Sequence, residues 1–204
     1  GCNNVDMDKH CQATCKLYKA KKNQDAMDSN AMEKVLMDFI TSDVKPIDIG
    51  ALYGKKFPIY PGEVVIVQGP PKCMKTMLLQ NWLNQLKVNT YFLEMEMRPR
   101  QMMMRFAMME LKKDEEEIVE MYKQGESIAD KFDWLTADYN PCRAFELQKR
   151  IQMQATKPDI VVIDHMGLFH SAHKDNNMKV EEASQALMEL AIQNNIVVFA
   201  VSEI

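Results

Sequence analysis

The chain has 204 residues, a formal net charge of −4, 47% hydrophobic residues and 26% charged residues. This length is enough for one domain with a substantial core and a short flanking segment. The acidic balance excludes a protein that coats nucleic acid through a globally basic surface, although it leaves room for DNA held in a channel by local cations. No stretch approaches the ~20 apolar residues that span a bilayer, and no signal peptide is visible. We therefore expect a cytoplasmic protein, in the host cytoplasm if it is viral, with no membrane partner.

The first 45 residues are predicted to be a lead-in to a main domain at residues 46–204. Within the lead-in, apolar residues recur at helical spacing over residues 28–41, which predicts a helix capped by Ser29 or Asn30. The first residue is Gly rather than Met, and the last residues have the pattern of a strand that a further element should cover. We therefore expect the chain to be part of a longer protein.

Three of the five cysteines fall in the lead-in. Thiolates and imidazoles are the ligands that Zn²⁺ prefers, so a small zinc site here would use Cys2, His10, Cys11 and Cys15. The spacing of these residues is irregular, which favours the alternative of reduced thiols in a linker.

From residue 63 onward, apolar runs of strand length alternate with helical patterns. Strands are predicted at residues 63–68, 90–94, 133–136, 159–164 and 196–201, and helices at residues 75–86, 101–111, 115–122, 143–155 and 178–194. This alternation is typical of an α/β fold with a mostly parallel sheet sandwiched by helices. The first run is continuously apolar, as expected for a strand covered on both faces.

Apolar spacing also predicts which face of two helices is buried. The helix at 75–86 is expected to bury Met77, Leu78, Trp82 and Leu86. The helix at 178–194 is expected to bury Val180, Ala183, Leu187, Leu190 and Ala191.

Between the first strand and its helix lies a candidate phosphate loop, Gly69-Pro70-Pro71-Lys72-Cys73-Met74-Lys75-Thr76. Backbone N–H groups of such a loop converge at a helix N-terminus, where the helix dipole favours an anion. Lys75 adds a full positive charge for the β- and γ-phosphates, and the Thr76 hydroxyl suits Mg²⁺. The pattern departs from the usual motif because Met74 stands where a second glycine is expected. We expect Met74 to be already helical, since a side chain is disfavoured at positive φ.

Acidic residues follow two of the predicted strands. Asp164 ends a buried apolar run, at the tip of a strand where ligands bind in parallel sheets and where a carboxylate can hold Mg²⁺ through water. Glu94 and Glu96 end the second strand, and at period two they are expected to share a face. A carboxylate there is suited to orient and deprotonate an attacking water.

These motifs, in this order and spacing, resemble the C-terminal motor domain of DnaB-type replicative helicases, including phage primase-helicases. The resemblance runs from Pro61 to Ile204. It rests on Pro61-Gly62-Glu63 before the loop, on the block from Phe92 to Arg105, on Ile163-Asp164-His165-Met166 and on Val201-Ser202-Glu203. Departures are Met74 for Gly, His165 for the usual Tyr, and Glu203 for a Gln that senses the γ-phosphate.

The resemblance implies a RecA-like P-loop ATPase that hydrolyses ATP with Mg²⁺. In it, Lys75 neutralises the transferring phosphoryl group, and Thr76 and Asp164 manage the metal. Counting back from Arg105 assigns the catalytic glutamate to Glu96, and Glu203 takes the sensor position. The family further implies a homo-hexamer that encircles single-stranded DNA, unwinds it 5′ to 3′ during replication, and works with a fused or separate primase.

Two alternatives stay open at this point. One is a different RecA-like ATPase, such as a recombinase or a KaiC-like regulator. The other is a nucleotide-binding assembly module whose altered loop no longer turns over.

Overall fold

The computed structural model describes residues 28–50, 56–172 and 175–203, and the chain divides into two compact units, Gly1–Val44 and Lys45–Ile204. In the first unit the described residues form helix α3 (Ser29–Thr41). The side chain of Asp28 caps this helix by accepting a hydrogen bond from the Ala31 backbone N–H at 2.8 Å. The predicted helix is therefore confirmed, but the cap lies one residue before the predicted Ser29.

In the second unit, five parallel strands form one sheet in the order β3-β7-β6-β4-β5. The strands are β3 (Val64–Gly69), β4 (Thr90–Glu94), β5 (Leu135–Asp138), β6 (Ile160–Asp164) and β7 (Val197–Glu203). The helices are α4 (Lys75–Leu86), α5 (Pro99–Leu111), α6 (Glu115–Lys123), α7 (Ala144–Gln152) and α8 (Asn176–Asn194). A short antiparallel ribbon, β1 (Ile47–Asp48) with β2 (Pro58–Ile59), precedes them, and single turns of 3₁₀ helix lie at η2 (Ala129–Phe132) and η3 (Met166–Leu168).

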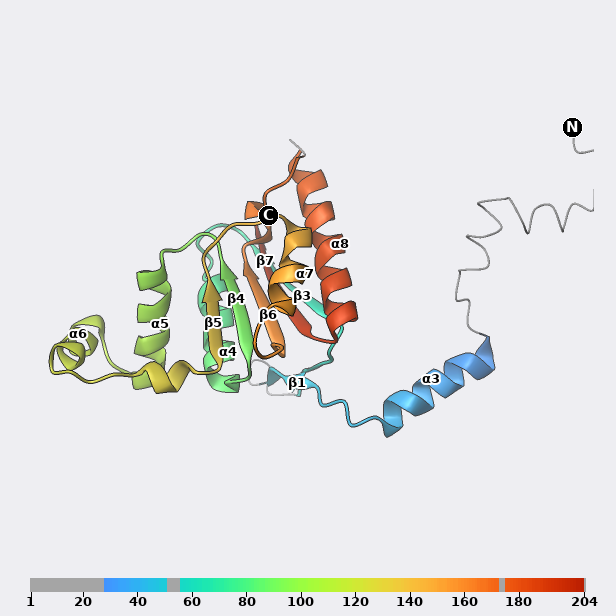
Figure 1. Ribbon diagram of the computed structural model, residues 1–204, viewed down its shortest axis with the longest axis horizontal. Helices are drawn as coiled ribbons and strands as arrows, with labels where there is room; N and C mark the ends of the chain where they lie inside the picture. The colour runs from blue at the N-terminus through green and yellow to red at the C-terminus, as the bar shows by residue number, and fades with distance from the viewer. Residues whose placement is uncertain (1–27, 51–55, 173–174, 204) are drawn as a thin grey trace, which may run out of the picture. The chain divides into compact units, whose positions relative to one another are not determined.

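Helices cover both faces of this sheet, which gives the three layers that the alternation predicts (Figure 1). Side chains alternate along each strand, so Phe92 and Leu93 on β4 enter different clusters. The cluster with Phe92 contains residues of α4, α5 and α6, and the cluster with Leu93 contains residues of α7 and α8. The three central strands β7, β6 and β4 are buried almost throughout.

Three details of the predicted burial are wrong. Strand β3 lies at the edge of the sheet and pairs only with β7 among the described strands, so Ile66 is 49% exposed rather than covered on both faces. Helix α4 buries Leu79 and Leu83, while Met77 is 42% exposed. On α8 the four predicted residues from Ala183 onward are buried, but Val180 near its N-terminus is 36% exposed.

The parallel register brings the carboxyl ends of the strands to one edge of the sheet. Gly69 at the end of β3 is the partner of Glu203 on β7, and Glu94 at the end of β4 is the partner of Asp164 on β6. The fold alone therefore places the start of the phosphate loop and three carboxylates along one edge.

Phe106 provides a test of the core on the α5 side. It is fully buried and makes edge-on contacts with Phe92, Phe132 and Trp134, at ring centroid distances of 6.4, 6.2 and 5.9 Å. We expect Phe106→Ala to lower the free energy of unfolding by about 3–5 kcal/mol, because it removes this ring and leaves a cavity. Urea denaturation measures the loss. The control is Phe145→Ala on α7, which is 59% exposed and should cost less than about 1 kcal/mol; equal losses would contradict the core described here.

Candidate functional site

The phosphate loop connects the end of β3 to the first turn of α4, and it folds back closely on itself. A Cβ atom added at Gly69 would lie 2.8 Å from the Cys73 Sγ atom, so any side chain there would require the exposed Cys73 thiol to move. The buried Lys75 ammonium group donates hydrogen bonds to the carbonyl oxygens of Gly69 and Pro70, each at 2.9 Å. The predicted loop thus surrounds its lysine with backbone groups.

Met74 is not helical as predicted; it has φ 65° and ψ 24° and stands just before α4 in the left-handed region. Lys72 also has φ 65°. A left-handed conformation costs an L-residue roughly 1–2 kcal/mol, which explains why a glycine is usual at the position of Met74. The Met74 side chain is 69% exposed, so it does not clash with the closed loop.

Thr76 on α4 and Asp164 on β6 are joined by a hydrogen bond of 2.5 Å, in which the hydroxyl donates to Oδ2. Asp164 is 1% exposed, and burial is the main cause that raises the pKa of its carboxyl. The hydroxyl of Thr76 opposes this shift because it bonds the charged form. The two residues that the sequence assigned to a metal are therefore in direct contact.

Glu94 and Glu96 do not share a face, because β4 ends at Glu94 and the backbone then turns. The Glu94 carboxylate is buried, and its Oε1 accepts hydrogen bonds from the backbone N–H groups of Glu96 and Met97 at 2.8 and 2.7 Å. Burial raises the pKa of Glu94 to about 7, and these two hydrogen bonds oppose the shift. Glu96 is exposed and lines the cleft.

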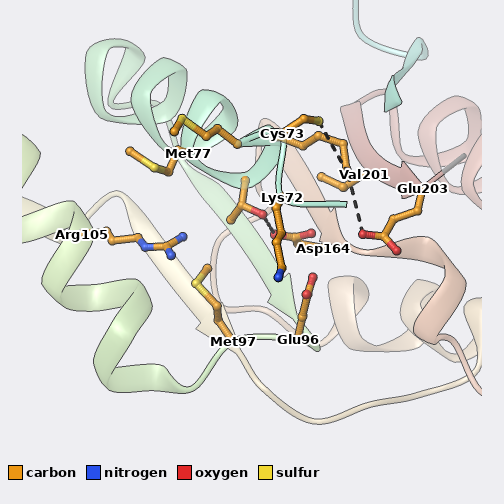
Figure 2. Close-up of a pocket in the computed structure, with 12 residues that line it drawn as sticks. Lys72, Cys73, Met77, Glu96, Met97, Arg105, Asp164, Val201 and Glu203 are labelled. Atoms are coloured by element: carbon orange, nitrogen blue, oxygen red, sulfur yellow. Dashed lines mark hydrogen bonds and ion pairs between the residues drawn. The ribbon is translucent and has the colours of Figure 1, made fainter. Parts of the chain in front are cut away.

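Glu203 at the end of β7 lies beside the loop. Its Oε1 atom is 3.8 Å from the Lys75 ammonium nitrogen, so the position that the resemblance gave to a sensor holds a carboxylate paired with the loop lysine (Figure 2).

Together these residues form a cleft of about 310 Å³ at the carboxyl edge of the sheet. From the predicted set, the cleft is lined by Lys72, Cys73, Met74, Lys75, Thr76, Glu96, Asp164 and Glu203. Pro70 and Pro71 belong to the loop but do not line the cleft. Sequence reasoning assigned no role to four further lining residues, which are Met77, Met97, Arg105 and Val201. For Arg105 a signal existed, because it belongs to the block that carries the family resemblance.

The side chains at the base of this edge suit a magnesium ion. Two buried carboxylate oxygens, Glu94 Oε2 and Asp164 Oδ1, have no hydrogen-bond partner among the described residues. Carboxylate and hydroxyl oxygens are the donors that Mg²⁺ prefers, and it usually takes one or two carboxylates together with substrate phosphates. Within the described part of the chain, no group of three or more His, Cys, Asp or Glu side chains is arranged to hold a metal. The four residues of the zinc hypothesis lie outside the described residues.

The comparisons with known proteins point to one family. A sequence model described as the DnaB-like helicase C terminal domain matches residues 57–204. This chain belongs to that family. No curated protein sequence matches it significantly.

A solved structure agrees with the RecA-like fold. A DnaB-like replicative helicase, described together with its interactions with primase, has a TM-score of 0.67 and 12% sequence identity, and the match covers 97% of this chain and 55% of that one. This chain therefore spans about half the length of that helicase. A RadB recombinase gives a TM-score of 0.49 at 14% identity over 76% of this chain and 67% of that one. No helix in the described ranges is long and apolar enough to cross a membrane.

The strain at Met74 leads to a stability prediction. Met74→Gly should change the free energy of unfolding by less than about 1 kcal/mol, because the relief of left-handed strain offsets the added flexibility of the unfolded chain. Met74→Val should cost about 1–2 kcal/mol, because a β-branched residue is strongly disfavoured at this φ. Thermal unfolding measures both. Met188→Val on the exposed face of α8 is the control, and a Met74→Val variant as stable as this control would contradict the backbone conformation.

The buried Glu94 leads to a pH prediction. Its folded-state pKa lies near 7, above the ordinary value of 4.5, so its contribution to stability is present below pH 4.5 and is lost as pH rises to 7. Glu94→Gln cannot ionise, so we expect it to stabilise the nucleotide-free protein at pH 8 by an amount on the order of 2 kcal/mol and to be neutral near pH 4. Urea denaturation across this pH range measures the effect. Glu96→Gln, at an exposed carboxylate two residues away, should change the free energy of unfolding at pH 8 by less than about 1 kcal/mol; an equal gain in both variants would contradict the prediction.

Proposed function

We propose that this chain is the ATP-hydrolysing motor domain of a replicative DNA helicase. The observation that carries the proposal is the contact of Thr76 with Asp164 beside the enclosed Lys75. This contact joins the phosphate loop and the metal-binding strand end into one site, in a chain of the DnaB-like helicase family.

The loop and its lysine provide the binding of the phosphates. Backbone N–H groups at the start of α4 are placed to bind an anion. Lys75 gives up its hydrogen bonds to the carbonyl oxygens of Gly69 and Pro70 and donates to phosphate oxygens instead. Thr76 and Asp164 are the residues that would hold Mg²⁺, with Asp164 acting through water. When bound, the ion neutralises charge on the phosphate oxygens.

Two carboxylates compete for the role of the base that activates water. Spacing from Arg105 assigns the role to Glu96, which lines the cleft. Glu94 is the register partner of Asp164 and its pKa is raised to about 7, but it is 1% exposed and does not line the cleft. A general base must come within hydrogen-bond reach of the water that it activates. We therefore assign the role to Glu96, and give Glu94 the role of fixing the turn that carries Glu96, through the hydrogen bond that it accepts from the Glu96 backbone N–H.

Glu203 is proposed as the residue that senses the nucleotide. Its carboxylate pairs with Lys75 across 3.8 Å. When Lys75 turns to the phosphates, this pairing weakens and the carboxylate at the end of β7 is repelled by the new negative charge.

Helicase action beyond ATP hydrolysis is proposed from the family. It comprises a homo-hexamer around single-stranded DNA, 5′ to 3′ unwinding during replication in the cytoplasm, and ATP sites between subunits with an arginine finger given in trans. The solved DnaB-like helicase is described with its interactions with primase, so a primase is the proposed partner.

ATP turnover tests this proposal. The protein should hydrolyse Mg-ATP faster with single-stranded DNA, and Lys75→Ala should abolish turnover. Glu96→Gln should lower turnover about 10²- to 10³-fold, because removing a general base costs roughly this much. Glu94→Gln, which keeps a side-chain oxygen to accept the turn hydrogen bonds, should cost less turnover than Glu96→Gln. Steady-state phosphate release measures all four.

Each other outcome has a defined meaning. A large loss in Glu94→Gln with an active Glu96→Gln moves the base to Glu94. Turnover that DNA does not stimulate favours another RecA-like ATPase, such as a recombinase or a KaiC-like regulator. Nucleotide binding without turnover favours an assembly module, and absence of nucleotide binding rejects the motor.

A further inference from the structure

Cys73 lies in the phosphate loop with its thiol at the surface. The residue is exposed, and it lines the cleft that the loop forms with the ends of the strands. Its Sγ atom is backed by Gly69, since a Cβ atom built at Gly69 would be only 2.8 Å away. A group bonded to this sulfur therefore has room only on the side away from Gly69, where the cleft opens.

The Cys73 sulfur is also close to the cation that is proposed to hold the phosphates. The Lys75 ammonium nitrogen lies 3.9 Å from Cys73 Sγ and 3.8 Å from Glu203 Oε1, and both contacts are drawn as dashed lines in Figure 2. A group attached to the sulfur thus occupies space beside Lys75. The phosphate oxygens of a nucleotide need the same space.

The surroundings of the Cys73 thiol are those of a cysteine that reacts. Reactive cysteines are accessible to solvent and lie in electropositive surroundings, whereas cysteines buried among apolar side chains are inert. Cys73 is exposed, follows Lys72 in the chain and has the Lys75 ammonium group beside it. Cys142 is the opposite case, because it is 1% exposed and burial is the main cause that raises the pKa of its thiol. Of these two thiols, Cys73 is the one that is open to modification.

A second observation indicates that the cleft around Cys73 takes a ligand. Asp164 lines the same cleft and is 1% exposed, and its Oδ1 atom has no hydrogen-bond partner among the described residues. A buried carboxylate oxygen without a partner is costly, so its partner is expected to enter from the cleft. That ligand and a group on Cys73 compete for one volume of about 310 Å³.

A small disulfide is the reagent that suits this site. Among the described residues the other thiol, that of Cys142, is buried in the cluster of α7 and α8, so it is not available to pair with Cys73. In exchange with a low-molecular-weight disulfide, the Cys73 thiolate attacks one sulfur and forms a new S–S bond. The S–S bond of the reagent breaks, and its other half leaves as a thiolate that takes up the proton lost by Cys73. Cys73 is oxidised and the reagent is reduced, and an excess of a free thiol reverses the exchange.

We propose that Cys73 is a reversible modification site, at which a mixed disulfide with a small thiol compound closes the cleft to nucleotide. This rests on the proposed function, since it assumes that the cleft holds a nucleotide. The two occupants exclude each other. Protein with bound nucleotide therefore resists modification, and modified protein does not begin turnover.

Oxidised glutathione tests this proposal, with the magnesium complex of a non-hydrolysable ATP analogue as the nucleotide. Treatment of the full chain should attach glutathione to Cys73, as detected by peptide mass mapping. The affinity for the analogue, measured by calorimetry, should fall about 100-fold, the loss expected for two hydrogen bonds to a charged group. Dithiothreitol should restore it. The analogue at about ten times its dissociation constant should slow the modification of Cys73 about 10-fold, because only the free cleft reacts.

Variants assign the effect to one thiol. In Cys73→Ser the affinity should be the same before and after treatment, whatever its value before treatment. Cys142→Ala should lose as much affinity on treatment as the unmutated protein. The same loss is expected in a variant that combines Cys2→Ser, Cys11→Ser and Cys15→Ser. If Cys73→Ser itself does not bind the analogue, the protection by nucleotide and the reversal by dithiothreitol in the unmutated protein decide.

Several results would overturn the assignment while leaving the ATPase proposal in place. These are a Cys73 thiol that the disulfide does not modify, a modified Cys73 with unchanged affinity, and a rate of modification that the nucleotide does not change. A loss of affinity that persists in treated Cys73→Ser has the same meaning. If the untreated, unmutated protein does not bind the analogue, the proposed function and this inference fail together.

Discussion

The hydrogen bond from the Thr76 hydroxyl to the Asp164 carboxylate is the contact on which the site depends. It connects the first turn of α4, on one face of the sheet, to the end of a central strand. Asp164 is buried, and the Thr76 hydroxyl is a donor that favours its charged form against the effect of burial. Strand β6 in turn holds Glu94 in register on β4. Asp164 thus stands between the loop helix, which its carboxylate contacts, and the end of β4, which pairs with its strand.

Much of the fold followed from the sequence because apolar periodicity reports burial directly. The runs that became β4 and β6 are buried on both faces, and their bounds were predicted closely. Errors arose because apolar periodicity does not report which elements lie next to a given strand or helix. An apolar run does not reveal whether its strand is central or at an edge, so the exposure of Ile66 on β3 was missed. Helix α4 has apolar residues on more than one face, so its sequence alone does not identify the buried face. In the structure Leu79 and Leu83 are buried.

The site was predictable to the extent that motifs report chemistry. Loop composition identified Lys75 and Thr76, and the acid at the end of an apolar run identified Asp164, since strand ends of a parallel sheet gather at one edge. The end of β4 was harder, because strand alternation was extended past the point where the backbone turns, and this made Glu94 and Glu96 look equivalent. At Met74 the substitution for glycine was read as a sign of helix, whereas the backbone keeps the conformation that glycine favours. The glycine of the usual motif reflects a required left-handed backbone conformation, and the identity of the residue at position 74 does not reveal this requirement.

Lys75 and Arg105 both line the cleft, and the helices that carry them, α4 and α5, pack into the same buried cluster. Leu79 and Leu83 beneath Lys75, and Met102 and Phe106 beneath Arg105, belong to one buried cluster. The separation of α4 and α5 therefore depends on how tightly this cluster fills its volume. Interiors packed at crystal-like density transmit small displacements, and sub-ångström misplacement of a catalytic group is costly. Substitutions in this cluster are thus candidates for tuning the catalytic rate independently of any residue that touches the nucleotide.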